Sequence, residues 1–359
     1  MFRTSTSSAV PRTGDGPLRV PLRSMPDVLV VNAGSTSLKL ALVSPEEDVR
    51  RPATLEDAAA AEVAAVGHRL VHGGRRYRTP LPIDAALKLR LRDLTVLAPL
   101  QNVPALQGIE RAEGAFPDVP HIGVFDTAFH RTIPPEAHTY AVPARWRDRW
   151  GIRRYGFHGL SVAWSASRIR VPRLVVCHLG GGCSITAVRD GRSVDTTMGF
   201  SPLEGVPMAT RSGAVDPGAI VYLLREGKLT IEEVDHALEH ESGLLGLGGS
   251  SDPRELEGTL ALRVYVYRIA AAVAEMAAAL GGLDAIVFTA GVGENSALVR
   301  RDICRRLAFL GVELDQAANK EAEPDCDIGA GGSPVRVVVV RAREELVIAR
   351  EVRLLGYGG

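Results

Sequence analysis

The stretch that decides the fold runs from residue 178 to residue 217 and reads HLGGGCSITAVRDGRSVDTTMGFSPLEGVPMATRSGAVDP. An apolar run, LVVC, leads into three consecutive glycines, Gly180 to Gly182, and SITAV leads on to a turn at Asp190 and Gly191. This pattern predicts a strand, a glycine turn and a second strand. Glycines leave backbone amides open to an anion, so the turn is a candidate phosphate-binding loop. A tight hairpin without a ligand is the commoner structure.

An earlier stretch, VLVVNAGSTSLKLALV at residues 28–43, repeats this layout. VVNAG corresponds to VCHLG, so we expect an internal duplication with one phosphate-facing hairpin in each of two domains. Alternation along the second strand places Ser35, Ser37 and Lys39 on one face, with Asn32 in the strand before it. A plain polar hairpin is the alternative, and the recurrence of the motif favours the functional interpretation.

The composition excludes several classes of protein. A chain of 359 residues is long enough for two domains, and 46% hydrophobic residues suffice for both cores. Acidic and basic residues balance at 42 each, which argues against nucleic acid and against a membrane surface as partners. The four cysteines have neither zinc-site spacing nor the density of a disulfide scaffold. With no apolar run of roughly 18 residues, we expect a soluble protein of the cytoplasm.

Residues 1–26 are rich in Ser, Thr, Arg, Pro and Gly and lack strand or helix periodicity, which predicts a disordered tail. The first predicted strand follows Met25 closely, so a natural start at Met25 is an alternative. A basic leader poor in acids is also compatible with a transit peptide, but the apolar centre of a secretory signal is missing.

Two further strands end in polar residues. GHRLVHGGRRY, residues 67–77, places Arg69 within a strand, where a guanidinium needs an anionic partner. VPHIGVFDTAFH, residues 119–130, predicts a buried strand that ends at Phe125, with Asp126 beyond its carboxyl edge, where α/β proteins bind ligands. Asp126 is therefore a candidate base or metal-orienting carboxylate, although a helix N-cap is the commoner role for such a residue.

The second half of the chain adds further polar motifs. His158 precedes a predicted helix and is a candidate phosphate contact, although a lone histidine is more often structural. A glycine-rich loop with Asp252 and Arg254 precedes a long Ala-rich helix, predicted from about residue 260 to 280. TAGVGEN, residues 289–295, predicts a strand, a glycine turn and a helix, suited to the base or ribose of a nucleotide. Glu344 opens a predicted helix, where an acidic residue also suits the helix dipole.

In this order, the motifs VNAGSTSLKL, GHRLVHGG, VFDTAFH, YGFHG, HLGGGCSITAVRDGRSVDTTMGFSPLEG, TRSGAVDP, FTAGVGENS and EELVIARE resemble the acetate kinase family, over residues 28–354. The resemblance implies an α/β fold of two duplicated actin-like, or ribonuclease H-like, domains with the active site in the cleft between them. It implies reversible transfer of the γ-phosphoryl group of ATP to acetate, giving acetyl phosphate and ADP. The implied metal is Mg²⁺, with Mn²⁺ as an alternative, and the implied assembly is a cytoplasmic homodimer.

On this resemblance, residues 27–165 form the N-terminal domain, completed by a C-terminal helix at about 344–359. Residues 166–343 form the nucleotide-binding domain. The methyl group of acetate would lie in a small apolar pocket formed by Val71, Leu100, Phe157 and Pro202.

The resemblance also assigns the chemistry. Arg69 and Arg211 would clamp the acetate carboxylate and the oxygens of the transferring phosphoryl group. His158 would bond to the same group, and Asp126 would orient or deprotonate the acceptor. Such an arrangement suits phosphoryl transfer, because cations and donors placed around the oxygens lower its barrier.

The metal and the nucleotide would be held by residues of both hairpins. Asn32 and Glu344 would bind Mg²⁺, with Ser35, Ser37 and Lys39 in the first phosphate loop. The residues expected to hold ATP are Lys39, His178, Leu179, Gly180, Gly181, Gly182, Asp252, Arg254, Gly291, Val292, Gly293, Glu294 and Asn295.

Three positions depart from the family pattern: Gly181 replaces the usual Asn, Gln101 the usual His, and Ala214 the usual Asp. The segment between Val43 and Gly67 is also shorter than usual. Two hypotheses follow. An active carboxylate kinase is favoured by the retained catalytic residues, with propionate as the alternative substrate. A weakly active or non-catalytic sensor of nucleotide or acyl phosphate is favoured by the three departures.

Overall fold

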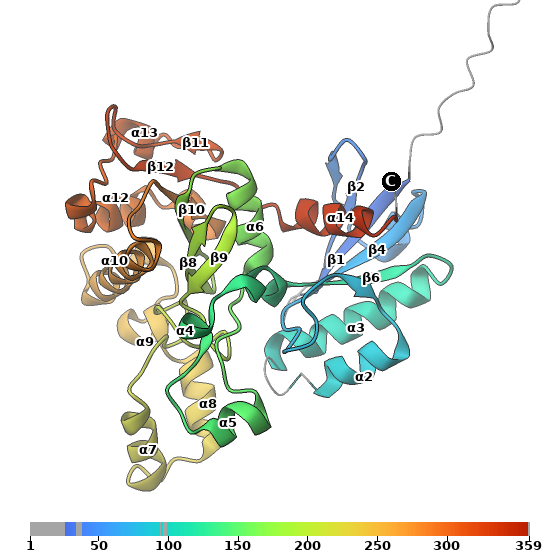
Figure 1. Cartoon of the computed structure of the whole chain (residues 1–359), viewed down its shortest axis with the longest axis horizontal. Coiled ribbons are helices and arrows are strands. Elements are labelled where there is room, and N and C mark those ends of the chain that lie inside the picture. Colours follow the sequence, from blue (N-terminus) through green and yellow to red (C-terminus); the bar gives the residue numbers. More distant parts are fainter. Residues whose placement is uncertain (1–25, 34–37, 94, 96–98, 358–359) are drawn as a thin grey trace, which may run out of the picture.

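The computed structural model describes residues 26–33, 38–93, 95 and 99–357 and contains two mixed six-stranded sheets, side by side in Figure 1. The strands of the first sheet are β1 (Asp27–Ala33), β2 (Leu38–Val43), β3 (Val49–Arg50), β4 (Val63–Leu70), β5 (Leu81–Pro82) and β6 (His121–Phe125). The strands of the second are β7 (Arg173–Leu179), β8 (Cys183–Arg189), β9 (Arg192–Thr196), β10 (Ala285–Thr289), β11 (Cys326–Asp327) and β12 (Arg336–Val339). The predicted tail at residues 1–26 lies outside the described residues, apart from Pro26.

The two sheets have the same topology. The first has the order β3-β2-β1-β4-β6-β5, and the second, read in the same sense, has the order β9-β8-β7-β10-β12-β11. In each, the first three strands along the chain are antiparallel neighbours, and three central strands (β1, β4 and β6, or β7, β10 and β12) run parallel. The predicted internal duplication and the two predicted hairpins are therefore confirmed.

Two helices lie between the sheets, as Figure 1 shows: α6 (Gly159–Arg168) and α14 (Glu344–Leu354). One buried apolar cluster joins these helices to strands of both sheets, for example Val30 of β1 and Val287 of β10. At Gly67 of β4 an added Cβ would lie 2.6 Å from Ile348 of α14, so this glycine permits the close approach of helix and sheet. The last helix of the chain thus completes the core of its first sheet.

The outer faces of the sheets are covered by other helices. On the first sheet these are α1 (Leu55–Ala58), α2 (Ala85–Asp93) and α3 (Pro99–Ala115). On the second, the core is built on α10 (Leu260–Leu280), with α12 (Ala297–Arg306) beside it. Thr259 caps the start of α10 by accepting from the amide of Leu262, and Gly281 in a left-handed conformation ends it. The predicted Ala-rich helix is confirmed.

The remaining elements are short or peripheral. The helices are α4 (Pro135–His138), α5 (Ala144–Trp150), α7 (Pro217–Arg225), α8 (Ile231–His240), α9 (Gly243–Gly248), α11 (Ala290–Asn295) and α13 (Gln316–Lys320). The 3₁₀ turns are η2 (Asp126–Thr132), η3 (Pro253–Leu256) and η4 (Ala308–Leu310). Among the described residues, no helix is both long and apolar enough to span a bilayer. All four cysteines are free thiols.

We propose that the two sheets are the cores of two domains, residues 27–165 with α14 and residues 166–343. The chain crosses from the first to the second between α6 and β7, and it returns between β12 and α14. The return leads directly into Glu344, which belongs to the cluster described next.

Candidate active site

Arg69, Asp126 and Glu344 form a buried ion-pair cluster at the carboxyl edge of the first sheet. Arg69 lies near the end of β4, Asp126 follows β6 directly, and Glu344 begins α14. The Arg69 Nε and Nη2 donate to Asp126 Oδ2 at 3.2 and 2.7 Å, and Nη1 lies 2.8 Å from Glu344 Oε2. The expected anionic partner of Arg69 is therefore present twice. Burial raises the pKa of Asp126, Arg69 opposes the rise and Glu344 adds to it.

Two stacked histidines continue the cluster into the second sheet. The rings of His158 and His178 lie 4.0 Å apart at 21°. His158 Nδ1 shares a hydrogen bond of 3.0 Å with Ser184 Oγ, and His178 Nδ1 shares one of 2.9 Å with Ser161 Oγ. Burial lowers the pKa of His178 to about 4, and burial together with His178 and Arg69 lowers that of His158. Both rings are neutral at neutral pH.

His158 has a strained backbone conformation at the point where α6 begins. His158 caps α6 with φ 57°, the left-handed region that non-glycine residues rarely adopt. Gly159 follows, and an added Cβ there would overlap the backbone carbonyl of Asp126. These two residues thus bring the start of α6 directly against Asp126, which follows β6. The motif YGFHG predicted the start of a helix but not this contact.

Arg211 reaches the same place from a loop of the second domain. Its Nε donates to Glu239 Oε2 at 2.8 Å. An added Cβ at Gly182 would lie 3.2 Å from His158 Nε2 and 3.4 Å from Arg211 Nη1, so the glycine turn, the histidine and the arginine meet there. The structure therefore brings together the four predicted catalytic residues, Arg69, Asp126, His158 and Arg211, with Glu344.

A pocket of about 450 Å³ lies beside the glycine turn. Seven residues predicted to hold ATP line it: Gly180, Gly181, Asp252, Arg254, Gly291, Val292 and Asn295. Four lining residues were not predicted, Ala209, Ser251, Pro253 and Ser296. The predicted residues Leu179, Gly182 and Gly293 do not line it, and Leu179 is fully buried in the sheet. Asp252 and Arg254 bond to each other across this rim, with Nε 3.0 Å from both carboxylate oxygens.

The segment from Gly291 to Asn295 differs from its prediction. It forms the short helix α11 rather than a glycine turn. The ends of α11 are capped by one of its own side chains and by one from α12. Glu294 Oε1 accepts from the amide of Ala290, and also from that of Ala342, and Arg300 Nη1 donates to the carbonyls of Gly293 and Glu294. The Glu294 carboxylate thus has an internal structural contact. It lines a second pocket rather than the one beside the glycine turn.

That second pocket, of about 360 Å³, holds the residues predicted for the metal and the first phosphate loop. Asn32 and Lys39 are opposite each other in the β1–β2 ladder, and Asn32 Nδ2 lies 3.5 Å from Glu344 Oε2. Arg51, which was not predicted, also lines the pocket and pairs with Glu345 at 2.6 Å. Ser35 and Ser37 lie outside the described residues.

These residues fit a magnesium ion. The described residues hold no group of three or more His, Cys, Asp or Glu side chains able to bind a metal. Mg²⁺ needs fewer protein ligands, because it commonly uses one or two carboxylates with substrate phosphates and water. Glu344 and the Asn32 amide supply oxygen donors, and Asp126 Oδ1 is buried without a hydrogen-bond partner. An unpartnered buried carboxylate oxygen beside a second carboxylate suits a hard cation.

Three residues of the predicted methyl pocket are described. Phe157 is 1% exposed, Pro202 is buried and Val71 is half-buried against the core that contains Phe157. The side chains of Leu100 and Gln101 lie outside the described residues. His72, next to Val71, packs against Tyr155 and Phe157 with ring centroids 4.6 and 5.5 Å apart.

Three partners that orient the site were not predicted from the sequence, namely Ser161, Ser184 and Glu239. Ser184 lies two residues after Gly182, in the predicted second strand. Because side chains two positions apart in a strand share a face, this spacing could have indicated that Ser184 faces the site. Glu239 lies 28 positions from Arg211, near the end of α8, and no local pattern marks it.

Known proteins resemble this chain over most of its length. A sequence model of the Acetokinase family matches residues 52–350. The acetate kinase of Protochlamydia amoebophila (strain UWE25) is 46% identical over 303 residues, covering 80% of this chain and 76% of that protein. The acetate kinase of Deinococcus radiodurans is 44% identical over an alignment 389 positions long, which covers 91% of this chain and 97% of that protein.

Solved structures agree. A propionate kinase from Francisella tularensis subsp. tularensis SCHU S4 has a TM-score of 0.84 at 33% identity, covering 91% of this chain and 99% of that one. The acetate kinase of Porphyromonas gingivalis has a TM-score of 0.82 at 32% identity, covering 92% and 99%. The expected α/β fold with two actin-like halves is confirmed. With these matches, the chain belongs to the acetokinase family.

Proposed function

We propose that the protein is an acetate kinase that transfers the γ-phosphoryl group of ATP to acetate, reversibly, giving acetyl phosphate and ADP. The observation that carries the proposal is the convergence of Arg211 and His158 on Gly182, with Arg69, Asp126 and Glu344 beside them. In phosphoryl transfer the protein acts mainly by positioning and by stabilising charge on the phosphoryl oxygens. Two guanidinium groups and a neutral imidazole donor meet that requirement.

Each residue then has a defined task. Arg69 and Arg211 hold the acetate carboxylate and the phosphoryl oxygens in line. When the Ser184 hydroxyl donates to Nδ1 of His158, Nε2 carries the ring proton and donates to the phosphoryl group. The low pKa of His158 means that this donor adds no charge. Acetate is already ionised at neutral pH, so Asp126 orients the acceptor and the metal rather than removing a proton.

The nucleotide lies in the pocket lined by Gly180, Gly181 and Gly291, with its phosphates against the amides of the glycine turn. Asn32 and Glu344, with Asp126 Oδ1, would hold Mg²⁺, or Mn²⁺ in its place. The bound cation neutralises phosphate charge. Lys39 stands on the same side and adds a cation near the phosphates.

The test is acetate-dependent formation of ADP with ATP and Mg²⁺, together with direct detection of acetyl phosphate. We expect both products in equal amounts and neither without acetate. An inactive protein that still binds ATP would refute the kinase proposal and support the sensor hypothesis.

A cytoplasmic homodimer is proposed on the family relationship alone. Its mass in solution, measured by light scattering, should be twice the 38.3 kDa of one chain.

A further inference from the structure

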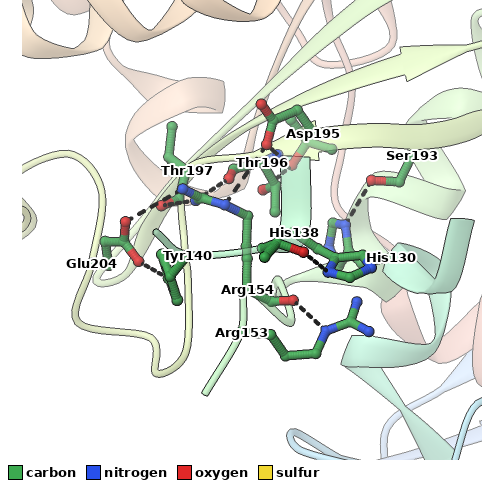
Figure 2. A network of polar contacts seen from close by, with 12 residues as sticks. His130, His138, Tyr140, Arg153, Arg154, Ser193, Asp195, Thr196, Thr197 and Glu204 are labelled. Atoms are coloured by element: carbon green, nitrogen blue, oxygen red, sulfur yellow. Dashed lines mark hydrogen bonds and ion pairs between the residues drawn. The ribbon is translucent and has the colours of Figure 1, made fainter. Parts of the chain in front are cut away.

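The loop that carries Pro202 is held by a dedicated polar network. It runs from Thr197 to Gly205 between β9 and the segment that carries Arg211. It has no regular secondary structure, so its shape depends on side-chain contacts. Figure 2 shows these contacts, which come from Tyr140, Arg154 and Glu204.

Arg154 anchors the base of the loop. Its Nη1 donates to the carbonyls of Thr196 and Thr197, the latter at 2.9 Å, and its Nη2 donates to Glu204 Oε1 at 3.3 Å. Asp195 lies 3.8 Å from Nε and completes the surroundings of the guanidinium. The Arg154 side chain is 17% exposed, so these bonds are largely shielded from water.

Tyr140 closes the loop from the other side. Its hydroxyl donates to Glu204 Oε2 and accepts from the amide of Phe200 at 3.0 Å. Burial and the Glu204 carboxylate raise the pKa of Tyr140, so the hydroxyl keeps its proton and remains a donor. One hydroxyl therefore joins the side chain at the end of the loop to the backbone at its middle.

The packing leaves no room for a side chain at the centre of this network. An added Cβ at Gly199 would overlap the Glu204 carboxylate and the Tyr140 hydroxyl. Gly205 has φ +111°, and an added Cβ there would lie 2.9 Å from Thr197 Cβ. The loop is thus closed tightly upon the Glu204 carboxylate.

The network is coupled to the other walls of the methyl pocket. The amide of Tyr155 donates to the carbonyl of Gly199 at 2.9 Å, and its ring lies 6.2 Å from that of Phe200. The same ring lies 4.6 Å from His72, which packs against Phe157. A chain of packed rings therefore links the loop to the residues beside Val71 and Phe157.

We propose that Tyr140, Glu204 and Arg154 are positioning residues that hold the Pro202 loop against the acyl site and so set which carboxylic acid fits. The inference rests on the proposed function, because it takes Pro202 as a wall of the acetate pocket. None of the three touches the phosphoryl group. Loosening them should change recognition of the acid and leave recognition of ATP unchanged.

The first test is Tyr140→Phe, which keeps the ring and removes only the hydroxyl. We expect the KM for acetate to rise roughly tenfold, the size of effect that follows loss of a hydrogen bond to a charged group. The KM for ATP should stay within about twofold. The ratio of kcat/KM for acetate to that for propionate should fall, because a loosened wall admits the extra methylene. A merely structural role would not separate the two KM values.

Three further variants sharpen the test. Tyr222→Phe makes the same change at a side chain that is 63% exposed on α7, and it should leave all these values unchanged. Glu204→Gln should raise the KM for acetate as Tyr140→Phe does. The double variant should be little worse than either single one, because both changes act on the same contact between Tyr140 and residue 204.

A second measurement is independent of catalysis. Hydrogen exchange at the amides of residues 197–206 should be faster in Tyr140→Phe than in Tyr222→Phe. Unchanged exchange, or an unchanged acetate KM and acid ratio in an active Tyr140→Phe enzyme, would overturn the proposal. The wild type could also show the expected exchange difference but lack acetate-dependent activity. That result would refute the assignment of Pro202 to an acetate pocket, and the proposal would fall with it.

Discussion

Replacing Arg69 by alanine should disable the enzyme and also strain the folded state. Arg69 uses Nε and Nη2 for Asp126 and Nη1 for Glu344. Its removal leaves two carboxylates facing each other, with side chains only 1% and 14% exposed. The pKa of Asp126, already raised by burial and by Glu344, should rise further, because the guanidinium that opposes the rise is gone.

Two magnitudes follow. Breaking a buried ion pair by removing one partner costs about 3 to 5 kcal/mol, which corresponds to a fall of several degrees in melting temperature for a chain of this size. Loss of a donor aimed at developing charge reduces kcat about 100-fold or more. Arg69→Lys keeps one positive charge but lacks the planar fork that spans both carboxylates. It should regain most of the stability and little of the activity.

The assay is kcat/KM for acetate by coupled ADP formation, with melting temperature measured on the same samples. Arg336→Ala is the matched control, because its ion pair with Asp327 at 3.1 Å is about half exposed and should contribute under about 1 kcal/mol. Near-native kcat/KM in Arg69→Ala would refute the clamp. Full activity in Arg69→Lys would show that charge alone is sufficient.

Three other outcomes are expected. Val71→Ala should lower the KM for propionate relative to that for acetate. An extra methylene gains about 0.8 kcal/mol where space exists and costs about 1 to 3 kcal/mol where it does not. An unchanged ratio of the two KM values would exclude Val71 from the pocket. Gly181→Asn should lower the KM for ATP at constant melting temperature, because an added Cβ meets nothing within 4 Å, and a higher KM would argue against a phosphate contact there. Stability should fall as the pH drops from about 6.5 towards 4: burial lowers the pKa of His130 and His178 to about 4, so the unfolded chain binds protons that the folded chain does not. A flat melting temperature over that range would contradict buried, neutral histidines.

Much of the fold was readable from local patterns. The two hairpins and the helix α10 follow from apolar alternation, glycine turns and capping residues, all of which act over a few positions. The segment from Gly291 to Asn295 was predicted to be a turn, because glycines disfavour a helix. Its helix forms because Glu294 and Arg300 bond to its terminal amide and carbonyls from 4 to 7 positions away. Residue propensities alone do not show that these side chains turn back onto the backbone.

The site divides in the same way. Arg69 in a strand demanded an anion, and the structure supplies Asp126 and Glu344, 57 and 275 positions away. The sequence alone predicted that Arg69 needs an anionic partner, but it did not identify that partner without the family resemblance. The contacts of Glu239 with Arg211 and of Tyr140 with Glu204 could not be predicted, because they join residues 28 and 64 positions apart that only the folded chain brings together.

The packing of α14 on the first sheet constrains the order in which the protein folds during synthesis. Asn32 and Glu344 touch although 312 positions separate them. During synthesis the strands β1, β4 and β6 leave the ribosome long before the helix that covers them, and domains tend to fold as they emerge. The inner face of that sheet, including Val28 and Val30, must therefore wait for the second domain to be made. Until then the nascent chain carries an uncovered apolar surface of the kind that chaperones bind, and the cluster of Arg69, Asp126 and Glu344 cannot form before Glu344 has been made.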